Sequence, residues 1–163
     1  MVVLRDLVEK DLEYLVKYLN EDNITKYLTR RIPRPYTHED AKWWFNVGSN
    51  AGVTKIIEVD GLFAGSIGAT IGEFEYERSA EIGYWLAKEY WGKGIATEAL
   101  NQMTNQILSS TEVVRIFAPV FSPNIASMRV LEKCGYILEG VLKKALYKNG
   151  DFFDKYLFAK VAS

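Results

Sequence analysis

Two glycines stand where an apolar run gives way to a helical pattern, in the segment EIGYWLAKEYWGKGIATEAL at residues 81–100. Because Gly92 and Gly94 carry no side chains, the backbone N–H groups at the start of the following helix can approach one ligand closely. The helix end adds roughly half a positive charge. A phosphate group is the usual ligand of such a site, and Lys93 and Thr97 lie close by in the sequence. The spacing predicts an anion site at this junction, although a tight turn with close helix packing fits the same glycines.

Three familiar motifs do not account for these residues. A Walker loop needs a Lys-Ser or Lys-Thr pair after its second glycine, and WGKGIAT has none. A dinucleotide-binding fingerprint needs a third glycine, where Thr97 stands, and an acidic residue after the next strand, where VVRIFAPV has none. The segment AGSIG resembles a hydrolase nucleophile elbow, but the only histidine, His38, precedes its serine. The anion site therefore needs another explanation.

Composition narrows the class of protein. The net charge is −1, so no broad basic field is available for nucleic acid. The single cysteine, Cys134, allows no intrachain disulfide and no cysteine-based zinc site, and we expect no metal. The N-terminus turns charged by Arg5, and no apolar run is long enough to span a bilayer. These features predict a cytoplasmic protein that binds neither nucleic acid nor membrane.

The elements that must position the glycine pair follow from periodicity and turn signals. The pattern predicts a strand, two helices, a three-strand meander, a helix, a strand, a helix and a final hairpin. Thr37 and Asp40 form a plausible capping box for the second helix. Asp60-Gly61 and Asn149-Gly150 mark two hairpin turns. With no linker in sight, residues 1–163 read as one mixed α/β (α+β) domain, a mixed sheet with helices packed on it.

Several segments together carry a family resemblance. YWGKGIATEAL resembles the acetyl-CoA pyrophosphate loop of the GNAT N-acetyltransferase superfamily, (Q/R)-x-x-G-x-(G/A), with Trp91, Gly94 and Ala96 at the three motif positions. LRDLVEKDLEYL, SPNIASMRVLEKCGYILEG and LYKNGDFFDKYLFAKV resemble the RimJ/RimL-type branch. The resemblance runs along essentially the whole chain in the right order.

The resemblance implies a transferase that moves an acetyl group from acetyl-CoA to a primary amine by direct attack in a ternary complex. It also implies a twisted, mostly antiparallel sheet that splays at a central bulge, with helices on both faces. The pantetheine arm would bind backbone groups near Leu86, and Asn124 and Ser127 would lie at the cofactor arm and the thioester sulfur. The pyrophosphate would bind the backbone amides of Gly92, Lys93, Gly94, Ile95, Ala96 and Thr97.

The catalytic residues depart from familiar patterns. Many relatives place a tyrosine acid where this chain has Leu131, and some carry a glutamate where it has Leu146. Glu81 stands where other branches have a strand glutamate base, although a sheet-rim carboxylate paired with a cation fits the same position. Ser127 is the second catalytic candidate, and a backbone-bonded helix serine is its alternative.

The sequence leaves three questions open. Because the acid–base residues are incomplete, a non-catalytic acyl-CoA-binding module is the alternative to an enzyme. The acceptor amine is either a protein N-terminus or a small molecule, and a homodimer is also compatible with the sequence.

Overall fold

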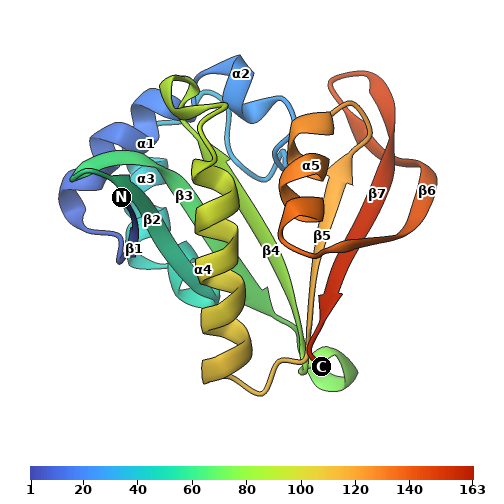
Figure 1. The fold of residues 1–163 in the computed structure, drawn as a ribbon. Coiled ribbons are helices and arrows are strands. Elements are labelled where there is room, and N and C mark those ends of the chain that lie inside the picture. Colours follow the sequence, from blue (N-terminus) through green and yellow to red (C-terminus); the bar gives the residue numbers. More distant parts are fainter. The chain divides into compact units, whose positions relative to one another are not determined.

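The computed structural model describes residues 1–163, and its seven strands form one mixed sheet in the order β1-β2-β3-β4-β5-β7-β6 (Figure 1). The strands are β1 (Val2–Arg5), β2 (Val53–Val59), β3 (Leu62–Ile71), β4 (Ser79–Leu86), β5 (Arg115–Phe121), β6 (Ile137–Lys148) and β7 (Asp151–Val161). The α-helices are α1 (Leu12–Tyr18), α2 (Asp22–Thr25), α3 (His38–Asn46), α4 (Ile95–Ser110) and α5 (Ile125–Lys133). Short 3-10 turns are η1 (Glu9–Asp11), η2 (Gly48–Ala51), η3 (Phe74–Tyr76) and η4 (Lys88–Tyr90). The mixed α/β class predicted from the sequence is confirmed.

Two compact units make up the chain. The first contains Met1–Thr70 and Gly83–Ala99, and the second contains Ile71–Ile82 and Leu100–Ser163. Both β4 and α4 continue from one unit into the other. Because the chain divides into two units, a single domain over residues 1–163 stays a prediction. The splay of the sheet at a central bulge also stays a prediction.

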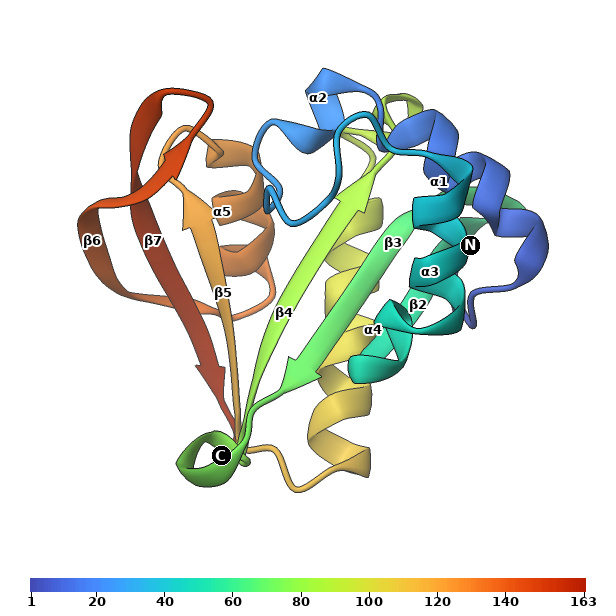
Figure 2. The same cartoon turned by 180° about the vertical axis from the view of Figure 1, so that it is seen from behind.

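The first unit is built on an antiparallel ladder of β1, β2 and β3. Val2 of β1 pairs with Val59 of β2, and Val59 also pairs with Leu62 of β3. Figure 2 shows α1 and α3 on one side of β2 and β3, where apolar residues of these helices pack against Ile56 and Phe63. Ala87, just beyond β4, belongs to the same core, so the end of β4 is held by the packing of the unit.

The second unit holds the start of β4 and the C-terminal strands. Glu81 lies opposite Phe117 in a parallel register between β4 and β5. β5 pairs with β7 and β7 with β6, both antiparallel, and Figure 1 shows α5 beside β5. The Asn149-Gly150 turn is confirmed, because both residues have positive φ values, of 52° and 84°.

Local signals were interpreted well where a turn or a cap defines the element. The predicted Thr37–Asp40 capping box is present at α3, and His38 in the first turn of this helix is exposed. The acidic segment around Glu75, where the sequence allows either a connection or a strand end, is a connection that contains the exposed turn η3. The short helix α2 was not predicted, since its four residues are too few to show a period.

Helix α5 begins at a cap residue. Proline is favoured in the first turn of a helix, so the sequence SPNIASMRVLEKCG predicts Pro123 early in the helix, whereas α5 starts at Ile125 with Asn124 as its N-terminal cap. Gly135 ends the segment with a φ of 83°, as expected. The cap residue rather than the proline therefore defines the start of this helix.

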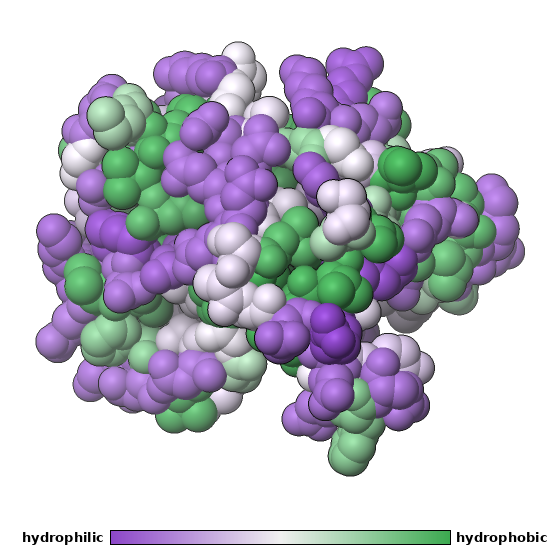
Figure 3. Space-filling model, turned by 60° about the horizontal axis from the view of Figure 1, so that its bottom comes forward, coloured by the Kyte–Doolittle hydropathy of each residue, from purple (hydrophilic) through white to green (hydrophobic).

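Neither hydrophilic nor hydrophobic residues dominate the face of the molecule in Figure 3. Figure 3 shows hydrophilic and hydrophobic residues intermixed over the face that it presents, with hydrophobic patches of limited extent. None of the helices combines the length and apolar content needed to cross a bilayer.

Candidate active site

The glycine pair adopts the backbone conformation that the anion-site hypothesis requires. Gly92 and Gly94 have φ values of 71° and 76°, in the left-handed region that disfavours other residues. A Cβ atom added at either glycine would meet no atom within 4 Å, so the space above the backbone is open. The helix α4 begins at the next residue, Ile95, and the carbonyl of Gly94 accepts the N–H of Glu98 over 3.1 Å.

The amides of this loop have no acceptor within the protein. The backbone N–H groups of five consecutive residues from Gly92 to Ala96 donate no hydrogen bond. All are exposed except Ile95, which is buried, and Ala96, which is half-buried like Thr97 after it. The buried Ile95 side chain anchors the helix while its backbone stays at the loop. A row of open donors at a helix N-terminus is the arrangement that binds phosphate oxygens.

Leu86 and Trp91 are joined directly. Leu86 ends β4 and is buried, and its carbonyl accepts the indole N–H of Trp91 over 2.9 Å. On the other side, the backbone N–H of Ala87 donates to the carbonyl of Ala64 over 2.8 Å. The backbone at Leu86 is therefore fixed at both β3 and the loop.

A second contact fixes the turn that precedes the loop. The Tyr18 hydroxyl on α1 donates to a carboxylate oxygen of Glu89 in η4 over 2.8 Å. Burial raises the pKa of Tyr18 to about 12, with Glu89 adding to the shift. The pKa of Glu89 lies below its usual value because its own backbone N–H and the Tyr18 hydroxyl stabilise the carboxylate. Sequence analysis missed this pair, since the two residues lie 71 positions apart.

Asn124 and Ser127 lie together at the start of α5 in the second unit. The Asn124 side-chain oxygen accepts the backbone N–H of Ser127 over 3.3 Å and so caps the helix. Both residues are half-buried. The N-x-x-S spacing was interpreted only through the family resemblance, yet asparagine is also a preferred N-cap, and that signal was available from the sequence.

Glu81 is exposed on β4 and forms no ion pair. The lysine or arginine partner of the alternative interpretation is therefore absent, and the catalytic role of Glu81 stays a prediction. Leu131, at the position of the missing tyrosine, is fully buried and packs in the core. Cys134 is also buried, at the end of α5.

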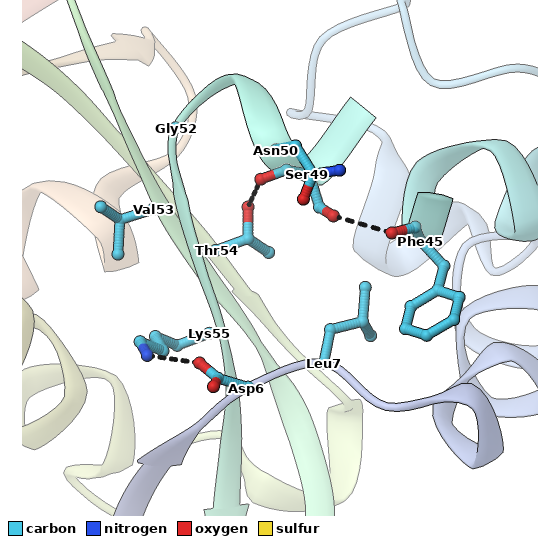
Figure 4. A pocket seen from close by; sticks show the side chains of 9 residues that line it. All are labelled: Asp6, Leu7, Phe45, Ser49, Asn50, Gly52, Val53, Thr54 and Lys55. Carbon is cyan, nitrogen blue, oxygen red and sulfur yellow. Dashed lines mark hydrogen bonds and ion pairs between the residues drawn. The ribbon is translucent and has the colours of Figure 1, made fainter. Parts of the chain in front are cut away.

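A pocket of about 360 Å³ lies elsewhere in the first unit, beside β2 and η2 (Figure 4). Its polar groups are already paired: Lys55 forms an ion pair with Asp6 at 2.5 Å, and Thr54 donates to the carbonyl of Ser49 over 3.4 Å. Figure 4 shows these side chains turned toward one another around the pocket rim. None of the predicted cofactor residues lines the pocket, so we assign it no part in the chemistry.

Comparison with known proteins identifies the family of this chain. The family model of the acetyltransferase (GNAT) domain matches residues 2–137. The uncharacterized N-acetyltransferase YnaD of Bacillus subtilis (strain 168) is 28% identical over 161 residues, covering 97% of this chain and 92% of that protein. The ribosomal-protein-serine acetyltransferase of Escherichia coli (strain K12) is 36% identical over 84 residues, 52% of this chain and 48% of that protein. This second similarity supports the RimJ/RimL-type branch.

Solved structures share the fold. An acetyltransferase (GNAT family) from Bacillus anthracis has a TM-score of 0.85 and 26% identity, covering 98% of this chain and 94% of that one. The microcin C7 self-immunity acetyltransferase MccE, solved with acetyl-CoA and AMP, has a TM-score of 0.83 and 26% identity, covering 98% and 92%. The second of these structures supports acetyl-CoA as the cosubstrate.

Proposed function

Since the chain belongs to the acetyltransferase (GNAT) family, we propose that it transfers the acetyl group of acetyl-CoA to a primary amine by direct attack in a ternary complex. The observation that carries the proposal is the row of unpaired amides from Gly92 to Ala96 at the start of α4. They are free to bind the pyrophosphate together with Lys93 and Thr97. The similarity to N-acetyltransferases favours an enzyme over a non-catalytic acyl-CoA-binding module.

The reaction requires few protein groups. The neutral amine nitrogen attacks the thioester carbonyl carbon, a C–N bond forms, and the carbonyl oxygen becomes an oxyanion. The nitrogen then loses its surplus proton to water, the C–S bond breaks, and CoA leaves as a thiolate that takes up one proton from water. Because a thioester is already activated, alignment of the two substrates supplies much of the rate. The backbone N–H of Leu86 is the proposed donor to the oxyanion.

Three side chains receive proposed roles. Glu81 accepts the proton of the amine, directly or through one water, because it is exposed and has no cation to hold its carboxylate. Asn124 contacts the cofactor arm, and Ser127 lies near the thioester sulfur, as in relatives with the same N-x-x-S spacing. No tyrosine acid is included, since Leu131 occupies that position and is buried.

The proposed acceptor is either the N-terminal amine of a protein or a small-molecule amine. The E. coli relative is named for a ribosomal-protein serine, which favours testing peptide N-termini first. The exposed carboxylates of Glu73, Glu75 and Glu77 favour a cationic acceptor of either class. We place the reaction in the cytoplasm, and the single cysteine fits a reducing compartment.

Two measurements test the function. Calorimetry should show one acetyl-CoA bound per chain. Thiol release from acetyl-CoA, followed with DTNB, should then accelerate with at least one member of a panel of peptide N-termini, polyamines, amino sugars and amino acids. Stoichiometric binding without turnover on any member of the panel would support the binding-module alternative instead.

The proposal includes a homodimer formed through β6. This strand is at one end of the sheet order, and a strand at an edge offers unpaired backbone groups to another chain. It also exposes apolar side chains, with Ile137 71% exposed and Leu138 43% exposed. A second copy of this chain would cover these residues and extend the sheet.

Sedimentation velocity tests the dimer. The wild-type protein should sediment as a dimer at micromolar concentration, and Ile137→Lys should shift it to monomer. Leu62→Lys is the matched control, because Leu62 is 62% exposed in the hairpin of the first unit, and that variant should stay dimeric. A monomeric wild-type protein, or a dimeric Ile137→Lys variant, would rule out this interface.

A further inference from the structure

The indole N–H of Trp91 is hydrogen-bonded, while the ring is exposed to solvent. Trp91 directly precedes the glycine pair, and its indole N–H donates to the carbonyl of Leu86 over 2.9 Å. Its backbone N–H donates to the carbonyl of Lys88 over 3.1 Å. The side chain is nevertheless 42% exposed, so apolar burial alone does not explain a tryptophan at this position.

The acceptor of this hydrogen bond is a rigid point. Ala87 is tied to Ala64 of β3 by a backbone hydrogen bond of 2.8 Å. The strands pack so closely that a Cβ added at Gly65 would lie 2.1 Å from the carbonyl oxygen of Trp85. The end of β4 therefore cannot shift without disturbing β3. A side chain that is hydrogen-bonded to the Leu86 carbonyl is held at a fixed position in turn.

The loop itself has little else to hold it. From Trp91 to Gly94, the indole hydrogen bond is the one side-chain hydrogen bond that the chain makes. The two glycines lie in left-handed conformations and bring no side-chain contacts. Glu89 in η4 and the buried Ile95 anchor the segments on either side, and the Trp91 indole is the direct side-chain link between the loop and Leu86.

We infer that Trp91 is a positioning residue that sets the spacing between the Leu86 backbone and the loop amides, and thereby the register of any ligand that uses both. The inference rests on the proposed function, because acetyl-CoA is such a ligand: its diphosphate binds the loop and its pantetheine arm reaches Leu86. A ligand that carries only the diphosphate uses the loop alone and does not depend on the spacing. Fixing the two points in advance lowers the ordering cost of binding acetyl-CoA.

The test separates these two kinds of ligand. Trp91→Phe keeps an aromatic ring and removes only the N–H donor. Calorimetry should show acetyl-CoA affinity falling about three- to tenfold, the usual weight of one hydrogen bond, while ADP affinity stays within twofold. In steady-state kinetics, KM for acetyl-CoA should rise by a similar factor and KM for the acceptor should stay unchanged.

Trp43→Phe is the matched control. Trp43 is 58% exposed and its indole makes no hydrogen bond, so neither ligand should lose affinity. Equal losses for ADP and acetyl-CoA in Trp91→Phe, or no loss for either, would overturn the inference. Failure of the wild-type protein to bind acetyl-CoA would contradict the proposed function itself, and this inference with it.

Discussion

The side-chain oxygen of Asn124 accepts the backbone N–H of Ser127 over a distance of 3.3 Å. Through this bond, the two residues that the family resemblance assigns to the cofactor are held in place by each other at the start of α5. An asparagine in this position stabilises the helix whether or not it touches a ligand. Its two roles need to be separated experimentally.

Two substitutions at Asn124 make that separation. Asn124→Ala removes the cap and should lower the free energy of unfolding by about 0.5–2 kcal/mol. Asn124→Ser keeps a capping oxygen and should unfold close to the wild-type temperature, yet it lacks the amide group and should bind acetyl-CoA more weakly. Thermal unfolding and calorimetry check the two expectations. Wild-type affinity in Asn124→Ser would leave Asn124 with the helix cap alone.

Gly94 should tolerate no large side chain if phosphates bind the loop. Gly94→Glu places a carboxylate in the open space above the amides, where both its bulk and its charge oppose a phosphate, so acetyl-CoA binding should fall below detection in calorimetry. Gly61→Glu is the control, because Gly61 also has a positive φ, of 82°, and no atom within 4 Å of an added Cβ. Both variants should lose similar stability, about 1–2 kcal/mol, and only the first should lose binding.

Local features of this fold could be predicted and distant ones could not. The Thr37–Asp40 cap and the Asn149-Gly150 turn are set by residues next to one another in the chain, so pattern analysis found both. The open loop amides likewise follow from two glycines at a helix start. The hydrogen bond between Tyr18 and Glu89 joins residues 71 positions apart, and no spacing rule encodes it.

The edge strand β6 shows a second limit of pattern analysis. It begins at Ile137, and most of its residues are exposed on both faces. A strand without a buried face lacks the alternation by which strands are recognised. Its apolar residues at an unpaired edge are the feature that the homodimer proposal uses.

Cys134 should be a spectator in catalysis. The thiol is buried, with the residue 3% exposed. The backbone carbonyl of Cys134 accepts a hydrogen bond from the ammonium group of Lys160 over 2.8 Å. Direct attack by the amine needs no acetyl-enzyme, so Cys134→Ala should keep turnover within about twofold while losing about 1 kcal/mol of stability. Double-reciprocal plots for the wild-type enzyme should intersect. Parallel lines, or a folded but inactive Cys134→Ala variant, would indicate a covalent intermediate.

Glu81→Gln tests the proposed base. Turnover at neutral pH should fall about ten- to a thousandfold, within or below the usual range for loss of a general base, while acetyl-CoA affinity stays unchanged. The deficit should shrink as pH rises, because more of the acceptor amine is then already neutral. Glu132→Gln, which changes another exposed carboxylate of the second unit, should have full activity. Normal turnover in Glu81→Gln with a verified acceptor would assign the proton transfer to bulk water.

Asp154 gives a prediction about stability and pH. Its carboxylate accepts the backbone N–H of Lys144 over 2.9 Å, where β6 bulges with a φ of 52°, and the ammonium group of Lys143 over 3.1 Å. The backbone N–H of Lys144, followed by Lys143, holds the pKa of Asp154 below its usual value. A folded-state pKa below the unfolded value means that the stabilisation is present above the unfolded pKa, about 3.9, and is lost as pH falls through the folded pKa.

Asp154→Asn should therefore lower the unfolding temperature at pH 5–7, and the gap between variant and wild type should close as pH falls through the lowered folded-state pKa of Asp154. Thermal unfolding of both proteins between pH 2.5 and 7, in the range that a depressed carboxylate pKa implies, measures the gap directly. Asp151→Asn is the control, because the side chain of Asp151 makes no hydrogen bond or ion pair, so this variant should follow the wild-type curve at every pH. A gap for Asp154→Asn that stays constant down to the lowest pH would show that the carboxylate charge does not hold the bulge.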